Sequence, residues 1–181
     1  MQVTATNLPG VVLLQPNQFG DARGSFSETW NQRVFAEATG FNGSFVQDNH
    51  SVSSPWVLRG LHYQINHAQG KLIRVSRGAI YDVAVDLRKS SPTFKQWTGQ
   101  RLTADNRLQL WVPAGFAHGF LTLETGADVL YKATDFYSPN DERTIMWNDP
   151  ELAIDWPTSE PPTLSEKDQI GSGFLEADLY D

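Results

Sequence analysis

Short apolar runs separated by turn residues recur along nearly the whole of this sequence, and few kinds of fold accommodate that pattern. Each run is about four to eight residues long, as β-strands usually are. The runs are rich in Val, Ile, Leu, Tyr and Trp, while Gly, Pro, Asn, Asp and Ser stand between them. The spacing predicts an all-β sandwich or barrel rather than βαβ units. The expected strands cover residues 10–15, 45–52, 57–64, 72–76, 80–87, 96–102, 108–112 and 128–133.

The segment YDVAVDL at residues 81–87 shows the strand pattern most clearly. Its large apolar residues alternate with Asp or Ala, so they point to one side of an extended chain. A period of two predicts that one face of this strand packs in the core.

One short helix is expected near residues 31–39. Val34, Phe35 and Ala38 fall on one stripe at helical spacing, and Gly40 can end the helix in a left-handed conformation. Beyond a Pro-rich stretch that follows Trp156, the sequence predicts a C-terminal arm at 164–168 and then an acidic, loosely packed tail at 170–181.

Length and charge narrow the possible functions. With 181 residues the chain can bury one sizeable core, so we expect a single domain over residues 1–181. There are 14 Lys and Arg against 21 Asp and Glu, and the formal charge of −7 argues against nucleic acid or an anionic membrane as partner. The absence of cysteine excludes disulfides and thiolate ligands. With neither a leader-like start nor an apolar run of about 18 residues, we expect a cytoplasmic protein.

Two of the four histidines lie in recognisable motifs: His62 in GLHYQ and His118 in PAGFAHG. These segments resemble the two motifs of the cupin superfamily, whose fold is a jelly roll, or double-stranded β-helix. Where metal-binding cupins supply His, His, Glu and His, this sequence has His62, Gln64, Lys71 and His118. Because an ammonium and a carboxamide are poor ligands for a divalent ion, we predict that the chain binds no catalytic metal.

A longer series of segments runs in order through nearly the whole chain. Its members are FGDARGSFSE at 19–28, FVQDNHS at 45–51, LRGLHYQ at 58–64, QGKLIRV at 69–75, YDVAVDLR at 81–88, SPTF at 91–94, WVPAGFAHGF at 111–120, LYKATDFYSP at 130–139, WNDPELAIDWP at 147–157 and LSEKD at 164–168. Together they resemble the dTDP-4-dehydrorhamnose 3,5-epimerases, a family within the cupins. The resemblance implies a cupin-type jelly roll with a short helix and a C-terminal arm. It also implies cofactor-independent inversion of carbons 3 and 5 in dTDP-4-dehydro-6-deoxy-D-glucose, giving dTDP-4-dehydro-L-rhamnose.

The same resemblance assigns four catalytic residues. His62 is the general base beside the keto group, and Asp168 fixes its ring and stabilises the imidazolium. Lys71 stabilises the enolate oxygen that develops at carbon 4. Tyr131 returns a proton from the other side, because inversion needs proton positions on both faces of the carbon. Without the resemblance, such a histidine or tyrosine is more often a core residue, and such a lysine is more often exposed.

The remaining matches concern substrate binding. In the family, an N-terminal segment from the neighbouring subunit contacts the nucleotide, so the resemblance implies a homodimer with an exchanged N-terminal segment. The matching residues of this segment are Arg23, Phe26 and Glu28. Sugar, diphosphate and other pocket contacts match Gln47, Asn49, Arg59, His118, Glu142 and Lys167.

Three other functions stay open. A family member that acts at only one of the two carbons would share the base and the lysine. A metal-dependent cupin oxygenase or isomerase is disfavoured by Gln64 and Lys71. A cupin that only binds or stores a nucleotide sugar would need no opposed acid and base, which His62 and Tyr131 would supply.

The spacing of Arg59 and His62 poses a geometric problem. Three positions apart on a regular strand, they would point to opposite faces. If both contact the ligand, the alternation must break between them, and Gly60 is the expected place for a bulge.

Overall fold

A computed structural model describes all residues of the chain, from Met1 to Asp181. Its main sheet contains β1 (Gln2–Ala5), β2 (Val12–Gln15), β5 (Gln47–Ser53), β6 (Leu58–Gln64), β7 (Lys71–Asp86), β8 (Trp97–Thr103), β9 (Gln109–Val112), β10 (Phe116–Ala133) and β11 (Glu142–Thr144). A separate hairpin consists of β3 (Gln18–Asp21) and β4 (Gly24–Ser27). The helical elements are α1 (Gln32–Thr39), α2 (Glu166–Gln169) and the 3-10 turn η1 (Phe174–Glu176).

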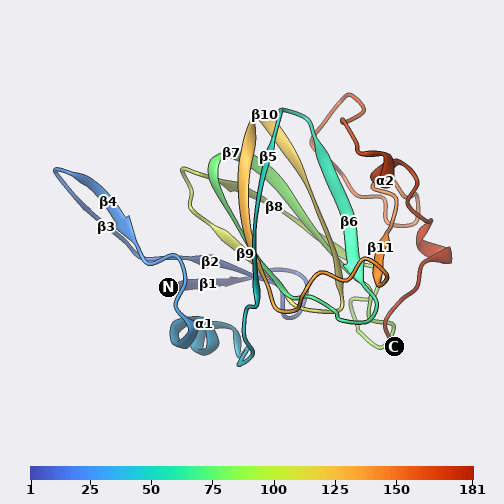
Figure 1. Cartoon of the computed structure of the whole chain (residues 1–181), viewed down its shortest axis with the longest axis horizontal. Coiled ribbons are helices and arrows are strands. Elements are labelled where there is room, and N and C mark those ends of the chain that lie inside the picture. Colours follow the sequence, from blue (N-terminus) through green and yellow to red (C-terminus); the bar gives the residue numbers. More distant parts are fainter.

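The long antiparallel strands β7 and β10 form the spine of the fold. One end of β7 pairs with β9 and the other with β8, while β10 pairs with β5 at one end and with β6 at the other. Strands that pass in this way from one layer to the next close the sheet around a core, as in a jelly roll. Figure 1 shows the layers enclosing this core, with the β3–β4 hairpin projecting from one side. The predicted all-β jelly roll is confirmed.

The runs expected at 72–76 and 80–87 are two parts of the single strand β7. Gly78, which suggests a turn in the sequence, has φ +74° and lies where the pairing of β7 with β10 changes register. Glycine tolerates this conformation, so the strand bends without ending.

Both faces of β7 are buried. Ile80 and Ala84 pack in a cluster between the strand layers, whereas Val83 and Val85 pack on the other face in a cluster that includes Trp156. The face that the sequence predicts to be buried, with Val83 and Val85, is therefore confirmed, and the opposite face is buried as well. The C-terminal part of the chain covers the face with Val83 and Val85, which would otherwise meet water.

Helix α1 lies where the sequence predicts it. The Asn31 side chain accepts hydrogen bonds from two N–H groups of the first turn, and Gly40 ends the helix with φ +75°. Its buried residue Phe35 packs edge-on against Trp111, with ring centroids 5.1 Å apart.

The segment after α2 is packed rather than loose. Phe174 is buried in the core, the Tyr63 hydroxyl donates to the carbonyl of Asp178 at 2.6 Å, and the Tyr180 hydroxyl donates to the carbonyl of Gln64 at 2.6 Å. The expected loosely packed tail is therefore wrong, because aromatic residues fasten the segment to the strands. Figure 1 shows it lying beside β6 and β11.

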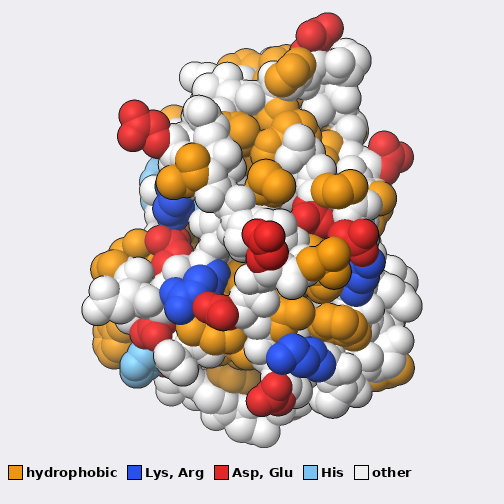
Figure 2. All heavy atoms as spheres, turned by 90° about the vertical axis from the view of Figure 1, so that its right-hand side faces the viewer, with side chains coloured by type: hydrophobic (Ala, Val, Ile, Leu, Met, Phe, Trp, Pro, Cys, Tyr) orange, Lys and Arg blue, Asp and Glu red, His pale blue; other side chains and the backbone are white.

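The surface on this side of the molecule is mixed in character. Figure 2 shows hydrophobic side chains interspersed with acidic and basic ones. No helix in the structure is both long and apolar enough to cross a lipid bilayer.

Hairpin β3–β4 is set apart from the rest of the chain. Phe19 and Phe26 are paired across it and are 63% and 68% exposed. An isolated two-stranded ribbon is marginally stable in water, and exposed aromatic pairs usually mark a contact surface. The apolar pattern alone does not predict this hairpin, because its strands are short and largely polar.

Candidate active site

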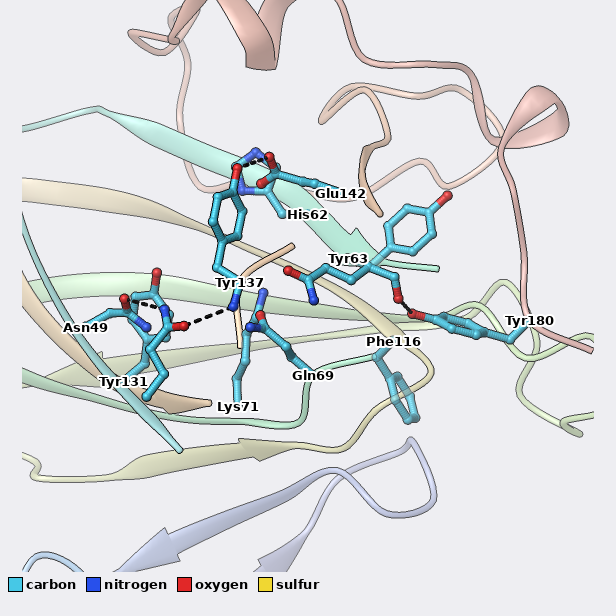
Figure 3. Close-up of a pocket in the computed structure, with 12 residues that line it drawn as sticks. Asn49, His62, Tyr63, Gln69, Lys71, Phe116, Tyr131, Tyr137, Glu142 and Tyr180 are labelled. Atoms are coloured by element: carbon cyan, nitrogen blue, oxygen red, sulfur yellow. Dashed lines mark hydrogen bonds between the residues drawn. The ribbon is translucent and has the colours of Figure 1, made fainter. Parts of the chain in front are cut away.

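Two adjoining hollows, of about 230 Å³ and 300 Å³, lie at one end of the barrel. Both are lined by His62, Lys71, Tyr131, Tyr137 and Glu142. These residues come from β6, β7, β10, the segment after β10, and β11. Figure 3 shows the Lys71 ammonium pointing into the cavity, with His62 and Tyr131 on different walls.

His62 and Asp168 form a closely paired dyad, with 2.5 Å between His62 Nε2 and Asp168 Oδ1. Asp168 also accepts a hydrogen bond from the Ser165 hydroxyl at 2.7 Å. Burial lowers the pKa of His62 below its ordinary value, although Asp168 opposes that shift. Burial alone would raise the pKa of Asp168, but hydrogen bonds from His62 and Ser165 lower it. A neutral imidazole that donates Nε2–H to the carboxylate keeps Nδ1 free to accept a proton.

A bulge in β6 directs Arg59 and His62 to the same cavity. Two residues separate them on β6, but only one residue separates their partners on β10. The extra residue falls near Gly60, which has φ +124° and approaches β10 so closely that a Cβ would lie 2.6 Å from a backbone atom. Because both side chains line the larger hollow, the expected bulge is confirmed.

Lys71 is a cation within the cavity. Burial lowers its pKa to about 8, while the carboxylates of Glu142 and Asp82 oppose the shift. A lysine with this pKa is still mostly charged at pH 7. It can therefore stabilise an oxygen that becomes negative during a reaction.

Tyr131 lies on β10 opposite Asn49 of β5. Burial raises the pKa of Tyr131, so its hydroxyl keeps its proton at neutral pH. The side chain is thus able to donate a proton or a hydrogen bond from a wall that His62 does not occupy.

A second histidine–aspartate pair lies deeper in the barrel. His118 Nε2 and Asp82 Oδ1 are 2.5 Å apart, and both side chains are buried. His118 lines the larger hollow, and the second Asp82 oxygen is buried without a hydrogen-bond partner. This carboxylate therefore supplies negative charge that helps to hold the proton on Lys71.

Glu142 joins the cavity wall to the C-terminal arm. It accepts a hydrogen bond from the Tyr137 hydroxyl at 2.8 Å and another from the Lys167 ammonium at 2.7 Å. Burial alone would raise the pKa of Glu142, but these two donors lower it. Lys167 directly precedes Asp168, so the Glu142–Lys167 contact links this wall of the cavity to the His62–Asp168 pair.

Gln47, Asn49 and Arg59 also lie at the cavity. Gln47 Nε2 donates to Asn49 Oδ1 at 2.9 Å, and both residues line the smaller hollow. Arg59 lines the larger one and donates from Nε to the Ser53 hydroxyl at 3.0 Å. Ten of the thirteen site residues that the sequence predicts are therefore gathered around one cavity.

Comparison with known proteins identifies the family of this chain. A family model for dTDP-4-dehydrorhamnose 3,5-epimerase matches residues 5–176. The dTDP-4-dehydrorhamnose 3,5-epimerase of Pseudomonas aeruginosa is 58% identical over 180 residues, which cover 99% of both chains. This chain belongs to the dTDP-4-dehydrorhamnose 3,5-epimerase family.

Solved structures agree with that membership. The dTDP-6-deoxy-D-glucose-3,5-epimerase of Legionella pneumophila, in complex with dTDP-4-keto-L-rhamnose, is 44% identical with a TM-score of 0.96, over 99% of this chain and 97% of that chain. A 3'-monoepimerase from Streptomyces bikiniensis, in complex with dTDP-quinovose, is 32% identical with a TM-score of 0.88, over 94% and 86% of the two chains. The same fold thus carries enzymes that act at one carbon and at two.

Three residues that the epimerase resemblance assigns to nucleotide binding lie outside the cavity. Arg23 and Phe26 are on the projecting hairpin, and Glu28 directly follows it. Arg23 Nη2 is 2.6 Å from Asp21 Oδ2, and Glu28 accepts a hydrogen bond from Asn31. A single chain does not bring these residues to His62.

The first cupin motif of this epimerase-family chain is not arranged like a metal site. All hydrogen-bonding groups of the Gln64 carboxamide contact backbone atoms of neighbouring loops. No group of three or more His, Asp or Glu residues is close enough together to hold a metal ion.

Sequence reasoning misses three tyrosines that line the smaller hollow: Tyr63, Tyr137 and Tyr180. The available signal for Tyr137 is the pair of adjacent aromatic residues in a segment rich in turn residues, where no core is expected. Tyr180 is not predicted because the sequence analysis expects residues 170–181 to be loosely packed. In the structure it lines the smaller hollow.

Proposed function

We propose that this chain inverts carbons 3 and 5 of dTDP-4-dehydro-6-deoxy-D-glucose, giving dTDP-4-dehydro-L-rhamnose in dTDP-rhamnose biosynthesis. One observation carries this proposal: a chain of the 3,5-epimerase family holds a base and a protonated hydroxyl on different walls of one cavity. Inversion requires two such groups, whereas binding alone requires neither.

His62 acts as the general base in this proposal. A carbon acid beside a ketone needs a base whose pKa lies near the working pH. The lowered pKa of His62 keeps the ring neutral before the reaction, and the Asp168 carboxylate stabilises the imidazolium afterwards. Support for this role comes from the 2.5 Å contact and from the burial of the Asp168 carboxylate.

Lys71 stabilises the intermediate. Removal of a proton from carbon 3 or carbon 5 places negative charge on the keto oxygen at carbon 4. A fixed ammonium beside that oxygen lowers the energy of the enolate without reorganising solvent. The position of Lys71 in the cavity supports this role, as does its mostly charged state at pH 7.

Tyr131 acts as the acid that completes inversion. If His62 returned its own proton to the same face, the starting configuration would be restored. A hydroxyl on another wall, with its pKa raised by burial, is suited to donate to the opposite face. The proposal therefore assigns abstraction to His62 and donation to Tyr131.

The functional unit in this proposal is a homodimer. Arg23, Phe26 and Glu28 of one subunit complete the nucleotide site of the other, since Phe26 suits stacking on thymine and Arg23 suits a phosphate. The exposed aromatic pair on the projecting hairpin supports this assembly. Other substrate contacts are assigned to the cavity residues Gln47, Asn49, Arg59, His118, Glu142 and Lys167.

Deuterium incorporation from solvent tests the reaction directly. With dTDP-4-dehydro-6-deoxy-D-glucose in D₂O, we expect deuterium at both carbon 3 and carbon 5, together with the L-configured product. Proton NMR measures the loss of each signal. Absence of exchange at both carbons would contradict the proposed function.

The second candidate is an epimerase that acts at one carbon, because a 3'-monoepimerase shares the fold. Exchange confined to carbon 3, with carbon 5 fully protonated in the product, would establish this alternative. We also propose a cofactor-independent enzyme, which should stay active after exhaustive chelation. A cytoplasmic location and a single domain over residues 1–181 stay predictions.

A further inference from the structure

The chain between Thr134 and Ser138 forms part of the cavity wall but belongs to no strand or helix. Buried or half-buried backbone groups need hydrogen-bond partners, and a segment outside a sheet must find them elsewhere. Here glutamine side chains bond four backbone groups of the segment. They are the carbonyls of Asp135 and Phe136 and the N–H groups of Tyr137 and Ser138.

Gln64 makes most of these contacts. Its Oε1 accepts from the N–H of Ser138 at 2.9 Å, and its Nε2 donates to the carbonyl of Phe136 at 3.2 Å and to that of His67 at 2.7 Å. The side chain is 4% exposed. Both amide hydrogens and the carbonyl oxygen are therefore engaged with backbone, so Gln64 acts through the loops that it holds.

Two further glutamines complete the arrangement from other elements. Gln47 on β5 accepts from the N–H of Tyr137 at 3.0 Å, and Gln69 donates from Nε2 to the carbonyl of Asp135 at 2.8 Å. We call Gln47, Gln64 and Gln69 together the glutamine clamp. All three line the smaller hollow, so the clamp holds the segment from the side of the cavity.

The residue held at the centre of the clamp is Tyr137. Tyr137 lines both hollows, and Figure 3 shows the hydroxyl end of its ring directed toward Glu142 and His62. The hydroxyl donates to Glu142, which also accepts from Lys167, the neighbour of Asp168. A shift of the 134–138 backbone would therefore move the ring in the cavity and disturb the support of the dyad.

We propose that Gln64 is a positioning residue, which through the glutamine clamp holds the Tyr137 ring in its place over the substrate. At a position where metal cupins place a ligand, this chain uses a carboxamide to shape the cavity wall. The inference rests on the proposed function, because its effect is read in the epimerase reaction. Displacement of a group that contacts substrate by about 1 Å can cost about a hundredfold in rate.

A double-mutant cycle tests whether Gln64 acts through Tyr137. Gln64→Glu keeps the side-chain shape but replaces two N–H donors with a carboxylate that repels the carbonyls of Phe136 and His67. We expect kcat/KM to fall about tenfold to a hundredfold when Tyr137 is present. In the Tyr137→Ala background the same change should cost less than about threefold, since the ring that it positions is gone.

Two controls separate the effect of the clamp on Tyr137 from a general effect of added charge and from unfolding. Gln15→Glu adds the same charge at an exposed position on β2 and should leave kcat/KM unchanged. Urea unfolding identifies any variant that does not fold, and Gln69→Met, which removes a single contact of the clamp, then carries the same cycle. An equal loss of kcat/KM with Tyr137 present and in the Tyr137→Ala background, or no loss in either, would overturn the inference. Wild-type protein without exchange would instead refute the proposed function.

Discussion

Lys71 illustrates how a single residue can serve the site at the expense of the fold. Its pKa in the folded chain is about 8, below the ordinary value of 10.5. The folded state therefore binds fewer protons than the unfolded state between these two pH values. The charged lysine destabilises the fold, and this penalty is fully present below about pH 8 and disappears as the pH rises through 10.5.

Replacement of Lys71 should separate stability from activity. Lys71→Met removes the partly buried charge while keeping an unbranched side chain, so we expect the free energy of unfolding at pH 7 to rise by about 1–3 kcal/mol. The gain should shrink as the pH rises toward 10.5, and exchange at both carbons should be lost. Urea unfolding at pH 7 and pH 10 measures the difference. A variant less stable than wild type at pH 7 would contradict this account of Lys71.

Some contacts of single residues cannot be predicted from spacing in the sequence. The His62–Asp168 pair joins positions 106 apart, and no spacing in the sequence predicts their contact. The prediction that His62 and Asp168 act together rests on the family resemblance, as do the roles predicted for Lys71 and Tyr131. The glutamine clamp had no such signal, because a carboxamide bonded to backbone leaves no pattern in residue type.

At the scale of elements, β6 shows how a local irregularity directs two side chains into the same cavity. The alternation rule correctly predicts that a bulge is needed between Arg59 and His62, and Gly60 provides it. The rule fails where elements are short or are covered by other segments. It misses β1 and β11, and it does not predict burial of the second face of β7, where Ala84 packs against residues of other strands.

Gly60→Ala should damage both stability and activity. The new Cβ would meet the backbone of β10 at 2.6 Å in a conformation with positive φ. We therefore expect the free energy of unfolding to fall by a value on the order of 3 kcal/mol. Exchange should fall even in the folded fraction, because Arg59 and His62 shift relative to each other. Thermal unfolding and exchange rates measure the two effects.

Gly40→Ala is the matched control for this prediction. Gly40 also has positive φ, but a Cβ there meets nothing within 4 Å. We expect backbone strain to lower the free energy of unfolding by about 1 kcal/mol. Deuterium exchange at carbons 3 and 5 of the substrate should be unchanged. If the two variants behaved alike, close approach to β10 would not be the reason for glycine at position 60.

At the scale of the whole molecule, the projecting hairpin is the feature that one chain leaves unexplained. Its exposed aromatic pair and the separation of Arg23 from His62 are both accounted for if two subunits exchange these segments. Strand spacing predicts an all-β sandwich or barrel, and the resemblance to the cupin motifs narrows this to a jelly roll. The proposed exchange of the hairpin rests on the family resemblance instead, because strand spacing within one chain carries no signal for contacts with a second subunit.

Mixing of two inactive variants tests the shared site. Arg23→Ala and His62→Ala homodimers should each be weak, but in a mixed dimer one site carries both lesions and the other carries none. Random mixing should therefore restore about a quarter of wild-type activity, since half the dimers are mixed and each has one intact site of two. With subunit exchange verified by mass spectrometry, no recovery would show that each site is built from one chain.

The central claim is that His62 removes the protons from both carbons. It is tested most directly by proton NMR of substrate in D₂O with His62→Asn, at protein concentrations where dTDP binding is shown to be intact. We expect exchange at carbon 3 and at carbon 5 to fall together, by about a hundredfold to ten-thousandfold. Exchange near the wild-type rate at either carbon would contradict the assignment of His62 as the base.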